Sequence, residues 1–375
     1  MSREDSYRLT PEEAGRYSRH FVLPGFGPEA QSRLRGAVVA VVGAGGLGAP
    51  VISYLAAAGI GTLGIFDHDT VSLSNLQRQV LFTTDDVGKS KASCAEQAVS
   101  RLNPHVKVVG HADQVTSANA LSLLASYDVI VDATDNFPTR YLLNDACVLL
   151  GKPLVYGSIF RYEGQVSVFN FQGGPNYRDL YPEPPKPGTV PDCEQGGVLG
   201  VLPGVIGSLQ ANEVIKVIAG IGDSLSGKLF LFDSLTLESR IIRLSKKQQA
   251  PILHLIDYDH FCGLTPVSKG MKEVTVEELK ALLDSKADIQ LIDVREPHEF
   301  DTCNLGGELI PMAEVPFNID KIATDKQVVI HCRSGGRSGN IIHWLEKNHG
   351  FTNLYNLKGG ILDWAKKIDP SMPAH

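Results

Sequence analysis

A glycine-rich turn at residues 43–48 constrains the fold of this chain more than any other feature. It reads Gly-Ala-Gly-Gly-Leu-Gly and lies between a β-branched run at 37–42 and an alanine-rich helical segment at 48–58. A second apolar run at 61–67 follows and ends in Asp67. Such glycines allow a tight turn and let backbone N–H groups approach a phosphate at a helix N-terminus. The order predicts a βαβ unit in a doubly wound, mainly parallel, Rossmann-like α/β sheet.

Further segments extend this sheet. We expect one helix that begins after the capping residue Thr10, and further helices over 89–103, 140–150 and 205–219. Strands are expected over 105–109, 127–132, 153–158 and 165–170, and a hairpin at 228–232 and 239–244. The strand at 165–170 alternates apolar and polar residues, which predicts antiparallel pairing. Residues 173–191 are dense in Pro and Gly and are expected to form one long loop.

The residues after the turn indicate which ligand it binds. By itself, the turn with Asp67 also fits an NAD- or FAD-binding domain. However, Arg78 can grip phosphate oxygens through its planar guanidinium, and Lys91 adds a further point charge. Asp135, at the end of a later strand, can hold Mg²⁺ between phosphates. Alone, the two cations could be surface charges and Asp135 a helix N-cap. Together they favour a triphosphate and metal site.

Several segments of residues 10–245 together resemble the MoeB/ThiF family of ubiquitin-activating-type adenylyltransferases. They are residues 16–20, 43–48, 67–79, 89–91, 133–136 and 203–210. The resemblance implies a homodimer that uses ATP and Mg²⁺. It also implies a protein substrate, a ubiquitin-fold sulfur carrier of the MoaD/ThiS type, whose C-terminal Gly-Gly carboxylate attacks the α-phosphate.

The same resemblance implies roles for individual residues. Asp67 would bind the ribose, Asn75, Arg78 and Lys91 the phosphates, and Asp135 the Mg²⁺, with Arg78 and Asp135 acting in catalysis. Arg19 would reach the active site of the partner subunit. The full nucleotide-binding set is Gly43, Gly45, Gly46, Gly48, Asp67, Ser74, Asn75, Leu76, Gln77, Arg78, Lys91, Asp135, Asn136 and Arg19.

Two features of the family are altered or undecided in this chain. Many relatives hold a structural zinc with two C-x-x-C pairs, but here those places read 176–179 (Asn-Tyr-Arg-Asp) and 259–262 (Asp-His-Phe-Cys). Oxygen ligands replace thiolates poorly on zinc, so we predict no structural zinc. Cys193 matches a cysteine that some relatives join transiently to the carrier, which makes it a candidate catalytic residue. It is equally well interpreted as a small buried residue, because its acidic neighbours, Asp192 and Glu194, would raise rather than lower its pKa.

A second α/β pattern begins near residue 272 and resembles a rhodanese (sulfurtransferase) domain. The resemblance rests on residues 293–300, 331–338 and 357–360. Cys332 follows a strand and precedes a helix, so backbone N–H groups can curl around its sulfur as an anion nest. Positive charge and the helix N-terminus would stabilise first a thiolate and then a persulfide. The predicted persulfide loop consists of Cys332, Arg333, Ser334, Gly335, Gly336 and Arg337.

Cysteine phosphatases use a loop of the same shape with a C-x5-R spacing, and we take Arg337 as the corresponding arginine. The run Asp-Val-Arg-Glu-Pro at 293–297 favours sulfur transfer over phosphatase chemistry. Cys303, Cys94 and Cys147 are expected to be structural.

The whole chain of 375 residues therefore divides into an adenylyltransferase domain at 1–245, a linker at 246–271 and a rhodanese domain at 272–375. A net charge of −7 argues against general nucleic-acid binding. The polar start, the lack of a long uninterrupted apolar run and six scattered cysteines predict a cytoplasmic protein without membrane contact.

We expect a sulfur relay for molybdopterin, thiamine (thiazole) or tRNA thiolation, with a cysteine desulfurase as one possible donor. Three alternatives stay open at this point: a nicotinamide oxidoreductase with an accessory domain, a carrier-binding scaffold without catalysis, and an activator that conjugates a carrier to protein targets.

Overall fold

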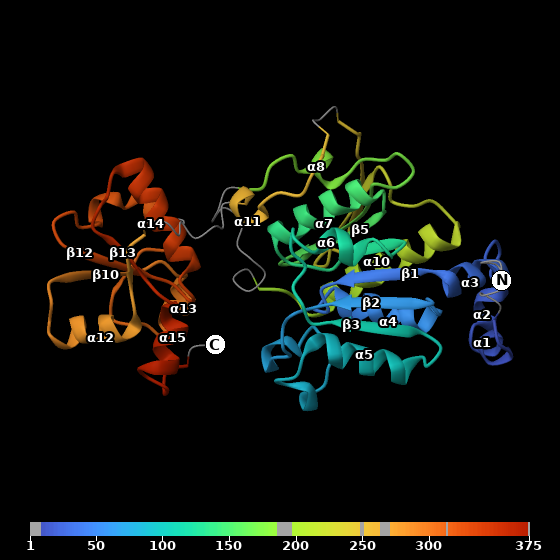
Figure 1. Cartoon of the computed structure of the whole chain (residues 1–375), viewed down its shortest axis with the longest axis horizontal. Helices are drawn as coiled ribbons and strands as arrows, with labels where there is room; N and C mark the ends of the chain where they lie inside the picture. The colour runs from blue at the N-terminus through green and yellow to red at the C-terminus, as the bar shows by residue number, and fades with distance from the viewer. Residues whose placement is uncertain (1–8, 186–196, 248–250, 263–270, 313, 374–375) are drawn as a thin grey trace. The chain divides into compact units, whose positions relative to one another are not determined.

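The computed structural model describes residues 9–185, 197–247, 251–262, 271–312 and 314–373. The chain forms two compact units (Figure 1). The first comprises residues 1–184 with 192–258, and the second 185–191 with 259–375.

The first unit is built on one eight-stranded sheet in the order β3-β2-β1-β4-β5-β6-β7-β8. Its parallel strands are β1 (Val38–Val42), β2 (Thr62–Phe66), β3 (Lys107–His111), β4 (Val129–Asp132) and β5 (Leu154–Phe160). The antiparallel strands are β6 (Glu163–Phe169), β7 (Lys228–Asp233) and β8 (Ser239–Arg243). This confirms the mainly parallel α/β fold, and it confirms antiparallel pairing for the strand expected at 165–170.

Helices cover this sheet and enclose a largely aliphatic core. In one contiguous set, α5 (Lys91–Leu102) packs on α4 (Gly48–Ala58), and α4 packs on α10 (Val201–Ala219). In another, α6 (Ala120–Leu124) and α8 (Tyr177–Leu180) both contact α7 (Phe137–Leu150). Helix α10 is long and apolar enough to cross a membrane by length and composition alone. It instead contacts α3 (Gly27–Gly36), α4, β5 and β6, which is the packing of a core helix.

Three short helices precede the sheet: α1 (Pro11–Arg16), α2 (Ser18–Phe21) and α3 (Gly27–Gly36). The first begins as its sequence predicts, because Thr10 and Glu13 form a reciprocal capping box. Glu13 is buried and also accepts a hydrogen bond from Arg35 at 2.6 Å. This contact ties α1 to α3.

Several element boundaries differ from the sequence-based expectation for local reasons. Strand β3 begins two residues later than expected, because Asn103 and His105 form a turn through the Asn103 side chain. Helix α7 begins three residues earlier, because Asn136 caps it through the N–H of Thr139. Helix α8 interrupts the expected loop at 173–191, since Asn176 and Asp179 form a capping box there.

The second unit contains a five-stranded, all-parallel sheet in the order β11-β10-β12-β13-β9. The strands are β9 (Glu273–Val274), β10 (Ile289–Asp293), β11 (Glu308–Leu309), β12 (Gln327–His331) and β13 (Leu354–Leu357). The helices include α12 (Val276–Asp284), α13 (Pro297–Thr302), α14 (Gly336–His349) and α15 (Gly360–Lys367). It is a smaller α/β domain, as expected.

Candidate functional site

The glycine turn between β1 and α4 leaves no room for side chains at two positions. Gly43 has φ of 95°, and a Cβ there would lie 2.6 Å from the carbonyl oxygen of Ala133. A Cβ at Gly48 would lie 2.0 Å from the carbonyl oxygen of Gly43. The turn therefore packs tightly on itself and on the segment after β4. That segment carries Asp135, so the contact brings two parts of the predicted site together.

Asp67 at the end of β2 joins the turn to the polar run that follows it. One of its carboxylate oxygens accepts a hydrogen bond from the Ala44 N–H at 2.7 Å. The other accepts one from the Asp69 N–H at 2.9 Å. Each oxygen keeps a second lone pair, so Asp67 can still accept a ribose hydroxyl.

The predicted phosphate residues lie on a short 3-10 helix, η2 (Leu73–Asn75), and just after it. The Arg78 side chain donates to the carbonyl oxygen of Ser74 at 3.1 Å. Its Cδ would lie 3.6 Å from a Cβ at Gly46, so Arg78 borders the glycine turn. Gln77 lies against Gly200, at the start of α10. Lys91, at the start of α5, is buried and pairs with Asp69 at 2.9 Å.

Asp135 is exposed on the segment between β4 and α7, and the buried residues beneath it hold that segment. Asp132 accepts hydrogen bonds from the Thr134 N–H and hydroxyl at 3.0 and 2.6 Å. Arg140 donates to the Thr134 carbonyl at 3.1 Å, and Gln210 donates to the Asp132 carbonyl at 2.7 Å. Sequence reasoning missed the support from Gln210, because this residue comes from a helix 78 residues away.

Burial raises the pKa of Asp132, and the nearby charge of Arg140 opposes that rise. An uncompensated carboxylate would be costly in this environment, so Asp132 and Arg140 stabilise one another beneath the segment.

Arg19 and Cys193 are not placed at this site. Arg19 is exposed on α2, and among the described residues no hydrogen bond or ion pair joins its side chain to the glycine turn or to the phosphate residues. Cys193 lies outside the described residues.

A network of hydrogen bonds and ion pairs occupies the region where zinc-binding relatives would carry their cysteines. Arg178 makes a bidentate ion pair with Asp145: its Nε and Nη2 lie 2.8 and 2.7 Å from the two carboxylate oxygens. The Tyr258 hydroxyl donates to the same carboxylate at 2.8 Å. Asp179 accepts a hydrogen bond from the Lys247 N–H at 2.7 Å. Within the expected linker at 246–271, Lys247 is thus fastened to α8 and Tyr258 to α7. Within the described residues, no group of three or more His, Cys, Asp or Glu residues could hold a metal ion. The absence of zinc remains a prediction, which elemental analysis of the purified protein tests.

Tyr258→Phe is expected to lower the free energy of unfolding of the first unit by about 1.5–3 kcal/mol, the usual contribution of a hydrogen bond to a charged group. Burial and the neighbouring Asp145 raise the pKa of Tyr258, so the hydroxyl keeps its proton and donates a hydrogen bond to that carboxylate throughout the neutral range. Scanning calorimetry, with exposed Tyr162→Phe as the matched control, measures the difference. Equal transitions for the wild type and the Tyr258 variant would contradict this role.

In the second unit, Cys332 lies between β12 and α14, as expected. Its Sγ accepts hydrogen bonds from the Gly335 N–H at 3.2 Å and from the Ser338 hydroxyl at 3.4 Å. Gly335 has φ of 98°, a conformation that favours glycine and turns the backbone toward the sulfur. The Ser338 hydroxyl also lies 2.6 Å from Oδ1 of Asn356, and its single proton can be donated to that oxygen or to the sulfur, one at a time. The arrangement suits an anionic sulfur.

Two expectations about Arg337 need correction. Only the four residues 333–336 separate it from Cys332, so the spacing is C-x4-R, one residue shorter than in the phosphatases. Ser338 occupies the position of the phosphatase arginine. In addition, both terminal nitrogens of Arg337 bind the carboxylate of Glu299, each at 2.8 Å. Burial would raise the pKa of Glu299, but Arg337 and the Glu296 N–H outweigh burial and lower it. The positive charge of Arg337 is therefore shared with a carboxylate and not directed at the sulfur alone.

A buried cluster lies directly before the persulfide loop. Arg295 binds Asp293 through several hydrogen bonds and donates to the Cys303 carbonyl at 2.7 Å, so the Asp-Val-Arg run and Cys303 form part of the scaffold. His331, fully buried, has a ring nitrogen 3.7 Å from an Asp293 oxygen. Burial lowers the pKa of His331 to about 4, despite Asp293, so the ring is neutral at pH 7.

The second unit is expected to lose stability as the pH falls from 6.5 to about 4, because only unfolded His331 is readily protonated there. Above pH 6.5 this loss is absent, and by about pH 4 the free energy of unfolding has fallen by roughly 3 kcal/mol. Urea unfolding followed by tryptophan fluorescence measures it, since both tryptophans, Trp344 and Trp364, lie in this unit. His331→Asn should show a shallower loss between these pH values than the wild type. Identical losses in the two proteins would show that His331 is not the responsible group.

The geometry thus defines a nucleotide-type Rossmann-like unit and a cysteine-loop sulfurtransferase-like unit in one chain. Residues 17–252 match the ThiF family model, and residues 275–367 match the model of the rhodanese-like domain. The chain belongs to the ThiF family and carries a C-terminal rhodanese domain.

Relatives with the same two-part organisation include the probable adenylyltransferase/sulfurtransferase MoeZ of Mycobacterium tuberculosis. It is 46% identical to this chain over 382 residues, which cover 98% of this chain and 97% of the relative. The adenylyltransferase and sulfurtransferase MOCS3 of Aedes aegypti is 42% identical to this chain, and the alignment covers 98% of this chain and 90% of the relative. Among solved structures, E. coli MccB with AMPCPP and MccA aligns with a TM-score of 0.55 at 25% identity. The alignment covers 66% of this chain and 75% of the MccB chain.

This chain is accordingly an adenylyltransferase and sulfurtransferase. The match to the ThiF family favours adenylyltransferase over nicotinamide oxidoreductase as the interpretation of the glycine turn. The match to the rhodanese-like domain favours sulfurtransferase over phosphatase as the interpretation of the Cys332 loop.

Proposed function

We propose that the first unit adenylates the C-terminal Gly-Gly of a ubiquitin-fold sulfur carrier, and that the rhodanese domain supplies the sulfur. The observation that carries the first half is the convergence of four groups at the carboxyl ends of the parallel strands. They are the glycine turn, Arg78, Lys91 and the segment that presents Asp135. Close packing, hydrogen bonds or an ion pair link each of them to a neighbour in this set or to Asp67 or Asp69.

In the adenylation step, the carrier's terminal carboxylate attacks the α-phosphate of ATP. A P–O bond forms to the carboxylate, the bond to the β-phosphate breaks, and pyrophosphate leaves. No protein nucleophile is needed, so the enzyme must act by positioning and by stabilising charge. The N–H groups of the glycine turn and the side chains of Arg78 and Lys91 supply donors for the phosphates. Asp67 holds the ribose.

Asp135 fits a site for Mg²⁺, which proteins commonly bind through one or two carboxylates together with substrate phosphates. Its carboxylate is exposed, and among the described residues no hydrogen bond or ion pair joins it to a basic side chain, while the residues beneath it are fixed. Mg²⁺ would neutralise charge on the triphosphate when bound there with ATP. We further propose a homodimer in which Arg19 serves the partner's site. Its exposure on α2 is compatible with that role.

The sulfur step uses Cys332 as a persulfide, loaded by a cysteine desulfurase or another sulfane donor. Its terminal sulfur attacks the acyl-adenylate carbonyl, which forms a carrier acyl-disulfide and releases AMP. A thiol then reduces the disulfide, and the carrier leaves as a thiocarboxylate while the thiol becomes disulfide-linked to Cys332. Cys193 is a candidate for that thiol. The product would serve molybdopterin, thiamine or tRNA thiolation chemistry in the cytoplasm.

ATP–pyrophosphate exchange tests the adenylation half. Purified protein with Mg·ATP, labelled pyrophosphate and a MoaD-type carrier should incorporate label into ATP, and a carrier that lacks its terminal Gly-Gly should give none. Failure with every carrier that ends in Gly-Gly would refute the proposal. Capture of the carrier on cellular proteins, without thiocarboxylate, would favour the alternative role in conjugation.

A further inference from the structure

An acid outside the expected nucleotide-binding set controls the lysine of that set. Asp69 lies two residues after Asp67, and its Oδ2 accepts a hydrogen bond from the Lys91 ammonium at 2.9 Å. The Lys91 side chain is only 7% exposed, whereas that of Asp69 is 57% exposed. The lysine is therefore largely removed from water, and its charge is balanced by an acid that stays at the surface.

The backbone fixes the same two residues against one another. The Lys91 N–H donates to the Asp69 carbonyl at 3.0 Å, and an antiparallel bridge joins Thr70 to Ser90. The Val71 N–H donates to the Lys89 carbonyl at 2.9 Å. Because these main-chain bonds set the register without the carboxylate, the Asp69 side chain is not needed to hold the two segments together.

Asp69 is also connected to the nucleotide side of the site. Its N–H binds Asp67, and Asp67 binds the N–H of Ala44 in the glycine turn. A continuous series of contacts thus runs from the turn through two acids to the ammonium of Lys91. A buried lysine has several rotatable bonds, and a fixed anion selects one orientation of its ammonium.

We propose that Asp69 is a positioning residue for adenylation: it holds the Lys91 ammonium in one orientation at the edge of the phosphate site. Lys91 has three N–H donors, so it can keep its bond to Asp69 while it donates to a phosphate. Asp69 itself stays off the nucleotide, since its carboxylate would repel the phosphates. This inference rests on the proposed adenylation.

Asp69→Asn tests it, because the amide keeps the size of the side chain and an acceptor oxygen but removes the charge. We expect the kcat of ATP–pyrophosphate exchange to fall about 10- to 100-fold, as for loss of a charged hydrogen bond, with KM for ATP changed less than about threefold. In a Lys91→Met background, the same change should have little further effect, because residues that act through one another are not additive. A purely structural role would instead lower stability and give additive losses.

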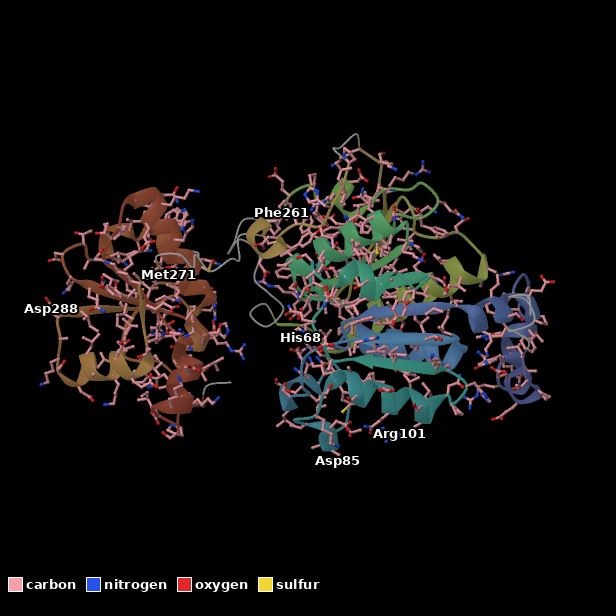
Figure 2. All side chains as sticks on the ribbon, viewed as in Figure 1. His68, Asp85, Arg101, Phe261, Met271 and Asp288 are labelled. Carbon is pink, nitrogen blue, oxygen red and sulfur yellow. The ribbon has the colours of Figure 1, made fainter. Side chains whose placement is uncertain are left out.

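Asp85→Asn is the matched control. It removes one exposed carboxylate from η3 (Thr84–Asp86), and Figure 2 shows Asp85 well away from His68, the neighbour of Asp69. Exchange in this variant should equal that of the wild type. If the wild type exchanges pyrophosphate and Asp69→Asn does so with an unchanged kcat, the inference about Asp69 is overturned, while the proposed adenylation stands. No exchange by the wild type would instead refute the proposed function on which it rests.

Discussion

Cys332→Ala is expected to abolish formation of carrier thiocarboxylate and to leave ATP–pyrophosphate exchange unchanged. Gly335 and Ser338 donate hydrogen bonds to the Cys332 sulfur. Among the cysteines that the structure describes, only Cys332 lies in a loop shaped to bind an anion. Alanine cannot form a persulfide, so the carrier should stop at the acyl-adenylate. Thiosulfate–cyanide sulfurtransfer by the same variant should fall to background.

Cys303→Ala provides the matched control in the same unit. Arg295 donates to the Cys303 carbonyl at 2.7 Å, which alanine retains, and alanine loses only the longer contact of 3.9 Å to the Cys303 Sγ, so sulfur transfer should stay near the wild-type rate. Full sulfurtransferase activity in Cys332→Ala would remove this cysteine from the mechanism.

Asp135→Asn is expected to reduce pyrophosphate exchange by two orders of magnitude or more, on the order of the loss of one preorganised electrostatic group. An amide is a much weaker ligand for Mg²⁺ than a carboxylate. The fold should survive, because Asp132, Arg140 and Gln210 hold the segment from beneath. Exchange measured over a range of Mg²⁺ concentrations would show the loss, with partial recovery at high metal concentration.

Asp223→Asn is a suitable control for this change. Asp223 is exposed beyond the C-terminal end of α10, on the order of 30 Å of helix away from the end that borders Gly46. Its exchange rate should match the wild type. If Asp135→Asn retained wild-type exchange at low Mg²⁺, Asp135 could not be the group that holds the metal.

The sequence predicted those parts of the fold that local chemistry specifies. The glycine turn, the capping box at Thr10 and the β-branched runs each act within a few residues, and the structure has a turn, a helix and strands there. The boundary errors came from equally local but weaker signals, such as the side-chain cap of Asn136. Helices α2 and α6, of four and five residues, carry too little periodicity to be recognised.

Charge pairing was the part of the site that could not be predicted. Arg337 looked like a free cation beside Cys332, but Glu299, 38 residues earlier, takes two of its hydrogen bonds. Lys91 and Asp69 are 22 residues apart, and Arg178 and Asp145 are 33 apart. Such partners meet only when strands and helices are assembled, so a single sequence identifies the charged residue but not the group that balances it.

The mass of the carrier after reaction tests the central claim most directly. A MoaD-type carrier is incubated with the full-length protein, Mg·ATP, a sulfane donor and a thiol reductant, and its intact mass is measured. The account predicts an ATP-dependent increase equal to the replacement of one oxygen by sulfur, which disappears in both Asp135→Asn and Cys332→Ala. A carrier that remains a carboxylate, in a reaction where the wild-type protein exchanges pyrophosphate, would contradict the claim that this chain both activates the carrier and delivers its sulfur.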